Sequence, residues 1–520
     1  MRGIIESTEP TENNISNDGA DVTPSLADHE ELIPAASKRL PVELWDIILS
    51  LNDDMPIDFE QRFVCVPPFV LRSVCCLWKN IVDRNPSLWT SVNLTCDAKN
   101  NTTGLQEAFD VVLRNSAMRP LSIYAKHGEI TFDANSTAVF PLFEKASHQT
   151  KFLQISGPHG VLKMAAACWR TSQSTFDIPL SNFDIEIELV NEVRLDLDDV
   201  MEPFVRGYPL STMRNLTLTV SCTNGTQVPA QDCEVFWAAA SELDWSALTT
   251  LKLATEEMNS ESTVEWNLTF CFLSKLLPFA PNLQHFRIEG DMILESSQSV
   301  TLGSLRTLYV HGVVHGEDLF PFLVCPALEE LDLGGCCSRA SMLDFVAQCT
   351  PTLTCLSIDF PLTTSVQDLI GYHTIGFLAH KLTALTLSVW WTVQMTTDTS
   401  FHFLSLSPSF FPALDHLHFD ITLRGNGIDQ FPWYQIDNFL PDTVARLLPG
   451  SKVPLRTFRL VFNMSFDRVL KEEHNVWWEG GMKSAVIRLL RTMKHHGQLE
   501  QDVSVYALTG HYGEQTLNLI

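Results

Sequence analysis

One short phrase recurs through most of this chain: an apolar residue, two variable residues, an apolar residue, one variable residue and a further apolar residue. It reads LQHFRI at 283–288 and LEELDL at 328–333, and successive copies start 22 to 41 residues apart. The last four positions alternate as a half-buried strand does, and helical patterns such as LQEAFDVVL and SMLDFVAQC lie between copies. The phrases begin at 190, 213, 248, 283, 305, 328, 353, 382, 414 and 455.

A strand and a helix repeated at this spacing predict a stack of repeats, in which each copy packs mainly on its neighbours. The pattern is that of an irregular leucine-rich repeat. We therefore expect residues 105–515 to form an α/β solenoid, shaped as a horseshoe, with a parallel sheet. Only Cys336 and Asn463 occupy the polar position that follows the strand in regular repeats. The alternative is an α/β protein whose strands merely share the same alternation.

Successive side chains of a strand point to opposite faces, so the residue between the last two apolar positions of a phrase should point away from the helices. These positions define a candidate concave surface: Thr217, Lys252, Arg287, Tyr309, Asp332, Ser357, Thr386, His418 and Arg459. The residues expected to face a target are Lys252, Arg287, Tyr309, Asp332, His418 and Arg459. Lys252, Arg287 and Tyr309 predict a basic and aromatic patch for an acidic or phosphorylated segment. The alternative is an ordinary solvated strand face.

Composition argues against several classes of partner. The formal charge of −27 would repel nucleic acid and anionic membranes. No stretch approaches the roughly 18 consecutive apolar residues of a membrane helix, and the N-terminus lacks the apolar segment of a secretory signal. Thirteen cysteines are too sparse for a disulfide scaffold, so reduced thiols are expected. We expect a cytoplasmic or nuclear protein without a nucleic-acid or membrane partner.

Catalytic and metal-binding motifs do not stand out in the sequence. It contains no G-x-S-x-G turn, no glycine-rich phosphate loop of the Walker type and no H-E-x-x-H helix. His416 and His418 share one strand face, and His495 and His496 lie near the end, but neither pair has a carboxylate at ligand spacing. We expect no catalytic centre, no metal site and no cofactor.

The N-terminal part has a different character. Residues 1–38 carry eight acidic and two basic side chains and little apolar surface, which predicts a disordered acidic tail. Pro41 then suits the first turn of a helix in which Leu44, Ile47 and Ile48 recur at helical spacing. Other apolar residues lie off this stripe, so the helix needs a second covering surface, such as a partner's groove.

A second helix is expected from Phe69 to Asp83, after an insert at 52–68. Its apolar stripe consists of Leu71, Val74, Cys75 and Trp78. Cys76 would lie about 100° away around such a helix, so the two adjacent thiols would point apart. This geometry favours Cys75 as a small apolar side chain over a redox or metal role.

The order of these elements resembles the F-box, a short helical module that docks on a Skp-type adaptor in cullin-based ubiquitin ligases. The resemblance rests on Leu40-Pro41, Glu43-Leu44, Ile47-Ile48, Val74-Cys75, Trp78 and, within NPSLWTSVNL, Pro86, Leu88 and Trp89. Residues 39–94 would form this small all-α module, in the variant with a long acidic insert that is abundant in mushroom-forming fungi. Cys76 and Leu77 depart from the family, which usually carries basic residues there.

The resemblance implies a non-catalytic receptor subunit whose repeats bind a target protein for ubiquitination. It assigns contacts with the adaptor, and through it with a cullin, to Leu40, Pro41, Leu44, Ile47, Ile48, Leu71, Val74, Cys75 and Trp78. Trp89 is expected in the core of the module. A second hypothesis is an F-box scaffold without a role in degradation. A third is an extracellular repeat receptor with glycans on asparagines such as Asn215 and Asn267.

Overall fold

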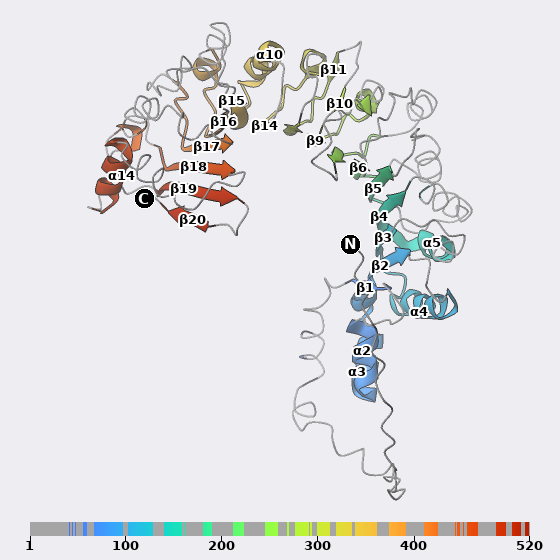
Figure 1. The fold of residues 1–520 in the computed structure, drawn as a ribbon. Helices are drawn as coiled ribbons and strands as arrows, with labels where there is room; N and C mark the ends of the chain where they lie inside the picture. Colours follow the sequence, from blue (N-terminus) through green and yellow to red (C-terminus); the bar gives the residue numbers. More distant parts are fainter. Residues whose placement is uncertain are drawn as a thin grey trace, which may run out of the picture.

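One extended sheet runs through the described chain and follows an open arc in the computed structural model (Figure 1). The described residues are 41, 44, 47, 56–59, 67–96, 102–127, 140–158, 162, 180–189, 212–222, 245–257, 268–269, 276–290, 292–293, 299–312, 319–334, 339–360, 374–391, 410–424, 443, 445–447, 451, 455–465, 485–495, 502–510 and 515–518. The expected tail, Leu40, Ile48 and the phrase at 190–195 lie outside these residues.

Sixteen strands of the described chain build the sheet, and they lie in sequence order. They are β1 (Ile57–Asp58), β2 (Ser91–Cys96), β3 (Leu121–His127), β4 (Thr150–Pro158), β5 (Asn182–Leu189), β6 (Asn215–Cys222), β7 (Thr250–Glu257), β9 (His285–Glu289), β12 (Thr307–His311), β14 (Glu330–Gly334), β15 (Cys355–Phe360), β16 (Ala384–Trp391), β17 (His416–Arg424), β18 (Thr457–Ser465), β19 (Asp502–Gly510) and β20 (Gln515–Asn518). All neighbours pair in parallel except β19 and β20, which are antiparallel.

The other elements are short or lie outside the sheet. The helices are α2 (Pro67–Val74), α3 (Cys76–Arg84), α4 (Thr102–Asn115), α5 (Phe140–Ala146), α10 (Arg339–Cys349) and α14 (Ala485–His495). Single 3-10 turns are η2 (Pro86–Trp89), η4 (Ser147–Gln149), η6 (Leu277–Phe279) and η7 (Phe320–Phe322). Two small parallel pairs join β8 (Leu268–Thr269) to β10 (Met292–Ile293) and β11 (Val300–Thr301) to β13 (Leu323–Val324).

Every phrase from residue 213 onward starts a strand at its third residue, as the alternation predicts. In LQHFRI, Leu283 precedes β9 and is buried together with Phe286 and Ile288 of the strand. The intervening residues of β9 are exposed or half-buried. The expectation of a mixed α/β protein with a large parallel sheet is therefore confirmed, in a form compatible with a solenoid.

The chain enters successive strands in the same way, which explains how phrases at unequal spacing stack in register. The amides of Arg306 and Thr307 both donate to the carbonyl of Gln284, at 2.8 and 2.9 Å. One repeat later, the amides of Glu329 and Glu330 donate to the carbonyl of Arg306, at 2.8 and 2.9 Å. Each phrase thus fixes the start of the next strand, whatever the length of the connection between them.

Helices α4, α5, α10 and α14 lie on the outer side of the arc, whereas α2 and α3 extend from the N-terminal end of the sheet (Figure 1). In α4, Leu105, Phe109 and Val112 recur at helical spacing and are buried. In α10, Phe345 and Val346 are buried in the same core. The opposite face of the sheet, on the inside of the arc, is left to the polar residues of the strands.

A further copy of the phrase, LSNFDI at 180–185, begins β5 and is not among the expected phrases. The strand before β6 in the described sheet is β5, which reads NFDIEIEL and pairs with β4 and β6; the phrase at 190–195 lies outside the described residues. Phe183 and Ile185 of β5 are buried. Leu180 is the buried leading leucine of this phrase, and β5 starts two residues later, as in the later repeats.

The expectation of an all-α segment at 39–94 also needs correction, because β1 and β2 both belong to this range. Ile57 and Asp58 pair with Val92 and Asn93, and the amide of Phe59 donates to the carbonyl of Asn93 at 2.8 Å. Ile57 and Phe59 are buried on either side of Asp58, which is the period of a strand. The insert therefore supplies an edge strand to the sheet.

The single helix expected from Phe69 to Asp83 is two helices, α2 and α3, interrupted at Cys75. Cys75 has an extended backbone, with φ −166° and ψ 168°, and its carbonyl accepts the first hydrogen bond of α3 from Lys79. Arg72 forms an ion pair with Asp83 at 2.7 Å. Eleven residues of continuous helix would separate these side chains by about 16 Å, so the break is what brings them together. The argument from helical neighbours therefore does not apply to Cys75 and Cys76.

Trp89 forms the centre of this N-terminal region, as expected, and is fully buried. Its indole N–H donates to the carbonyl of Val82 at 2.9 Å. The ring of Phe69 meets it edge-on at 5.2 Å, and the guanidinium of Arg72 lies 5.6 Å from its centroid. Trp89 thus joins α2, α3 and the first long strand, β2, into one unit.

Candidate functional site

The residues expected to contact an adaptor lie on or near the N-terminal helices. Pro41, Leu44 and Ile47 are exposed, and the amide of Leu44 donates to the carbonyl of Pro41 at 3.0 Å. Val74 is exposed, whereas the side chains at positions 71, 75 and 78 are half-buried. Because α2 ends at Val74, the stripe expected on one helix is divided between two helices.

The expected outward positions form one continuous row across the sheet. The strand register pairs them in order: Thr217, Lys252, Arg287, Tyr309, Asp332, Ser357, Thr386, His418 and Arg459. The row continues through Asp184, Gln154, Tyr124 and Asn93 at one end and Ser504 at the other. From Asn93 to Arg459, these positions alternate with the buried apolar residues of the same strands. The sequence therefore located the central row of the concave face.

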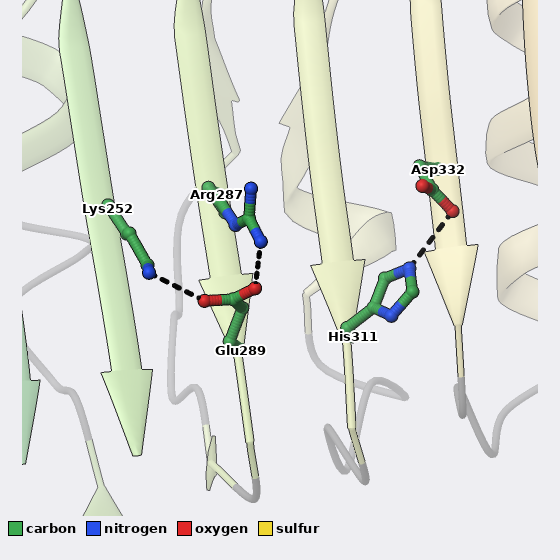
Figure 2. A network of polar contacts seen from close by, with 5 residues as sticks. All are labelled: Lys252, Arg287, Glu289, His311 and Asp332. Atoms are coloured by element: carbon green, nitrogen blue, oxygen red, sulfur yellow. Dashed lines mark hydrogen bonds and ion pairs between the residues drawn. The ribbon is translucent and has the colours of Figure 1, made fainter. Parts of the chain in front are cut away.

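A carboxylate absent from the sequence-based prediction organises the middle of this row. Figure 2 shows the side chains of Lys252 and Arg287 converging on Glu289. The ammonium of Lys252 lies 2.8 Å from one carboxylate oxygen, and the guanidinium of Arg287 pairs with the other. Glu289 is two residues beyond Arg287 on β9 and so faces the same side. Continuing the alternation past the phrase would have found it.

Three side chains extend the cluster toward β14. The guanidinium of Arg287 lies 4.1 Å from the ring centroid of Tyr309. Tyr309 stacks on His311 with centroids 4.0 Å apart and planes 6° apart. The imidazole Nε2 of His311 lies 3.0 Å from the carboxylate of Asp332 (Figure 2). Together with Lys252 and Glu289, these residues form a half-buried polar network, which we call the concave network.

Electrostatics of the concave network differ from the expected basic patch. Burial opposes ionisation of Glu289, but hydrogen bonds and charges from Arg287 and Lys252 outweigh it and hold the pKa of Glu289 below its ordinary value. The hydrogen bond to Glu289 raises the pKa of Arg287. Burial raises the pKa of Tyr309. Lys252 and Arg287 share the single carboxylate of Glu289, so the predicted basic and aromatic patch also contains an acidic side chain; its role as a binding site for an acidic segment stays a prediction.

His418 and Arg459 lie farther along the same row, on β17 and β18. They are direct neighbours in the strand register. Burial, and secondarily the charge of Arg459, lowers the pKa of His418. The Nε2 atom of His418 is buried and has no hydrogen-bond partner among the described residues. This pair is separate from the concave network, since Ser357 and Thr386 occupy the row between Asp332 and His418.

Asp184, on β5, carries the most perturbed carboxyl of the described part of the row. Burial raises its pKa from 3.8 to about 6, and the neighbouring charge of Glu186 adds to this shift, while Lys252 opposes it. The folded chain therefore retains a proton between about pH 4 and pH 6 that the unfolded chain has released. Stability from this proton is complete below about pH 4 and is lost as the pH rises through about 6.

Substitution of Asp184 should remove the free-energy cost of ionising this partly buried carboxyl in the folded chain at neutral pH. We expect Asp184→Asn to be more stable than the unsubstituted chain at pH 7, by on the order of 1 kcal/mol because the carboxyl is only half-buried. The two should converge at about pH 4. Thermal unfolding between pH 4 and pH 7 measures the difference. Asp344→Asn, an exposed aspartate on α10, is the matched control. A constant difference across this range would contradict the assignment.

The described cysteine, histidine and acidic residues are the candidates for a metal site and for reactive thiols. No group of three or more His, Cys, Asp or Glu side chains in the described ranges is placed to hold a metal ion. Cys75, Cys76, Cys325, Cys349 and Cys355 are free thiols. Burial raises the pKa of Cys349 to about 12 and also raises that of Cys325, so both are unreactive thiols in the core. None of the described helices is long and apolar enough to cross a membrane.

The fold and its surfaces define a mixed α/β protein with a large parallel sheet, one face of which carries a continuous polar row. Comparison with known proteins does not narrow this class further: no family model matches the chain, and no curated protein shows a significant match.

Proposed function

We propose that this chain is the substrate-recognition subunit of a cullin-based ubiquitin ligase, with an F-box module that docks on a Skp-type adaptor and a leucine-rich-repeat solenoid that binds a target protein. The chain would act by tethering the target near the ubiquitin-loaded enzyme. It would supply no catalytic group of its own.

The observation that carries the proposal is the concentration of exposed apolar side chains beside the sheet. Five of the ten large apolar side chains that are exposed in the described chain lie between residues 44 and 77: Leu44, Ile47, Val70, Val74 and Leu77. Leu44 is 43 % exposed, Ile47 58 % and Val74 56 %. Exposed apolar side chains gathered on short helices are typical of a surface that a partner covers.

The row of polar side chains on the concave face supports the proposal that the repeats bind a target protein. It is polar, solvent-facing and continuous over many strands, whereas the opposite face is buried under helices. Extended polar surfaces of this kind are what stacked repeats use to bind other macromolecules. A polar row on a solenoid is more often a binding surface than an active site.

Co-purification with a Skp-type adaptor tests whether the N-terminal helices dock on such an adaptor. We expect the full chain to form a stable complex. Leu44→Asp combined with Ile47→Asp, or Val74→Asp alone, should weaken it by about thirtyfold or more, because each places a charge in the interface. Leu378→Asp is the matched control, since Leu378 is similarly exposed, at 45 %, but lies far along the chain. Pull-down and calorimetry measure the affinities.

Failure of the folded chain to bind any such adaptor would refute the proposal. An equal loss of binding in Leu378→Asp would show that the effect is not local. The scaffold alternative predicts the same adaptor complex, so it needs a separate measurement. A target that co-purifies through the repeats should persist longer in cells when the receptor is deleted, whereas a scaffold would leave its half-life unchanged.

A further inference from the structure

A hollow of about 340 Å³ opens on the concave face at the N-terminal end of the sheet, away from the concave network. It lies over β2, β3, β4 and β5, and Pro56 forms its edge beside β1. Its remaining lining residues are Ser91, Asn93, Tyr124, Ala125, Lys126, Gln154, Ser156 and Glu186. None of them belongs to the surface expected from the sequence.

The strand register explains why this stretch of sheet is hollowed. Lys126, Ser156 and Glu186 occupy neighbouring places on β3, β4 and β5. Tyr124 and Gln154 form the row before them. Ser156 is thus a short side chain surrounded by long ones, and the space above it stays open.

The hydroxyl of Ser156 is buried without a hydrogen-bond partner in the described chain. The side chain of this residue is 6 % exposed. A buried hydroxyl without a partner costs about 1–3 kcal/mol, so such groups are normally paired. A ligand in the hollow would provide a partner for this hydroxyl.

The charges around the hollow favour a cation on its β5 side. Glu186 lines the hollow, and Asp184 stands two residues before it on the same strand and face. The nearest described cation in the row of Asp184 is Lys252, which already pairs with Glu289. Lys126 lies two strands from Glu186, or about 10 Å at ordinary strand spacing, which is about a Debye length at physiological salt. Burial is the main cause of the raised pKa of Asp184, and the charge of Glu186 adds to it.

Tyr124 adds an aromatic wall to the same space. Its ring centroid lies 5.1 Å from that of Phe152, which holds it in place. Aromatic faces attract ammonium and guanidinium groups and also pack against the methylene stems of lysine and arginine. The carboxylate, hydroxyl and ring together suit a long cationic side chain better than an apolar or anionic one.

We propose that the hollow over β2 to β5 binds a lysine or arginine side chain in a basic segment of a partner protein. The cationic head would lie between Glu186 and the ring of Tyr124, within reach of the Ser156 hydroxyl. The formal charge of −27 would speed encounter with such a segment. This assigns a ligand class to the target-binding surface and in that respect rests on the proposed function.

Binding of labelled peptides to the full chain tests this inference directly. The probes are a short peptide of alternating lysine and serine, the same peptide with arginine, and a control with norleucine in place of lysine. Fluorescence anisotropy at physiological salt gives their affinities. We expect the lysine or the arginine peptide to bind and the norleucine peptide not to bind; the two cationic probes show which head group is preferred.

Variants then distinguish binding in the hollow from attraction by the overall negative charge of the chain. Glu186→Gln, which keeps the shape of the side chain, should weaken binding about ten- to a hundredfold. Ser156→Val, which removes the hydroxyl and fills the hollow, should also weaken it. Glu107→Gln is the matched control: Glu107 is exposed on α4, and its loss should change the affinity less than about twofold at this ionic strength. Thermal unfolding verifies that each variant is folded.

Two results would overturn the inference: no binding of either cationic peptide to the unsubstituted chain, or equal losses in Glu186→Gln and Glu107→Gln. Neither measurement involves the adaptor. A chain that binds an adaptor but no cationic peptide refutes the hollow alone, and a chain that binds the peptide but no adaptor refutes the proposed function alone.

Discussion

Trp89→Ala should destabilise the N-terminal region by about 3–5 kcal/mol, the usual range for truncation of a buried tryptophan. The side chain is fully buried, and its N–H bonds the last turn of α3 at the carbonyl of Val82. Removing the ring would leave a cavity against Phe69 and deprive Arg72 of its aromatic neighbour. Since α2 and α3 have little other apolar cover, we expect both helices to lose protection first.

Hydrogen exchange by mass spectrometry measures this loss segment by segment. Peptides covering residues 67–96 should exchange faster in Trp89→Ala, while peptides from β12 to β17 should be unchanged, because distant repeats contact only their neighbours. Trp89→Phe keeps most of the buried area and should lose much less. Leu77→Ala, at an exposed position of α3, is the control for a truncation without a cavity. Uniform protection in all three variants would contradict a central role for Trp89.

Gly312→Ala should be strongly destabilising, although it adds only one methyl group in the middle of the sheet. Gly312 follows β12 with φ +109°, a conformation that costs an alanine about 1–3 kcal/mol. A Cβ there would also lie 2.6 Å from the carbonyl oxygen of Gly290, so the backbone itself must shift. The amide of Gly312 donates to the carbonyl of Gly334 at 2.9 Å, and this bond would be strained. We expect a loss of stability of about 3 kcal/mol.

The matched control for this glycine lies in the same repeat. Gly303 is exposed, and a Cβ built on it would meet nothing within 4 Å. Gly303→Ala should therefore leave the midpoint of thermal unfolding nearly unchanged, whereas Gly312→Ala lowers it. Equal midpoints for the two variants would show that the turn after β12 adapts to a side chain. Such adaptation should also disturb the pairing of His311 with Asp332, because His311 directly precedes Gly312.

The phrase in the sequence specified the middle and C-terminal strands closely. Each leading leucine, such as Leu283 or Leu353, is buried, and each strand starts two residues later. The strands before residue 190 were harder to predict, because β3 and β4 have Pro120 and Thr150 in place of the leading leucine, whereas β5 has Leu180. Periodicity also could not show the break at Cys75, since the apolar spacing across it is helical on both sides.

The sequence by itself determined which side chains face outward, because alternation along a strand is a local property of the backbone. Only the tertiary structure decided what those side chains do. Glu289 pairs with Lys252 because parallel pairing places β7 beside β9, and it also pairs with Arg287 of its own strand. Ser156 lies at the bottom of a hollow because Lys126 and Glu186 become its neighbours in the register. Contacts of this kind depend on connections of variable length, which a local pattern does not encode.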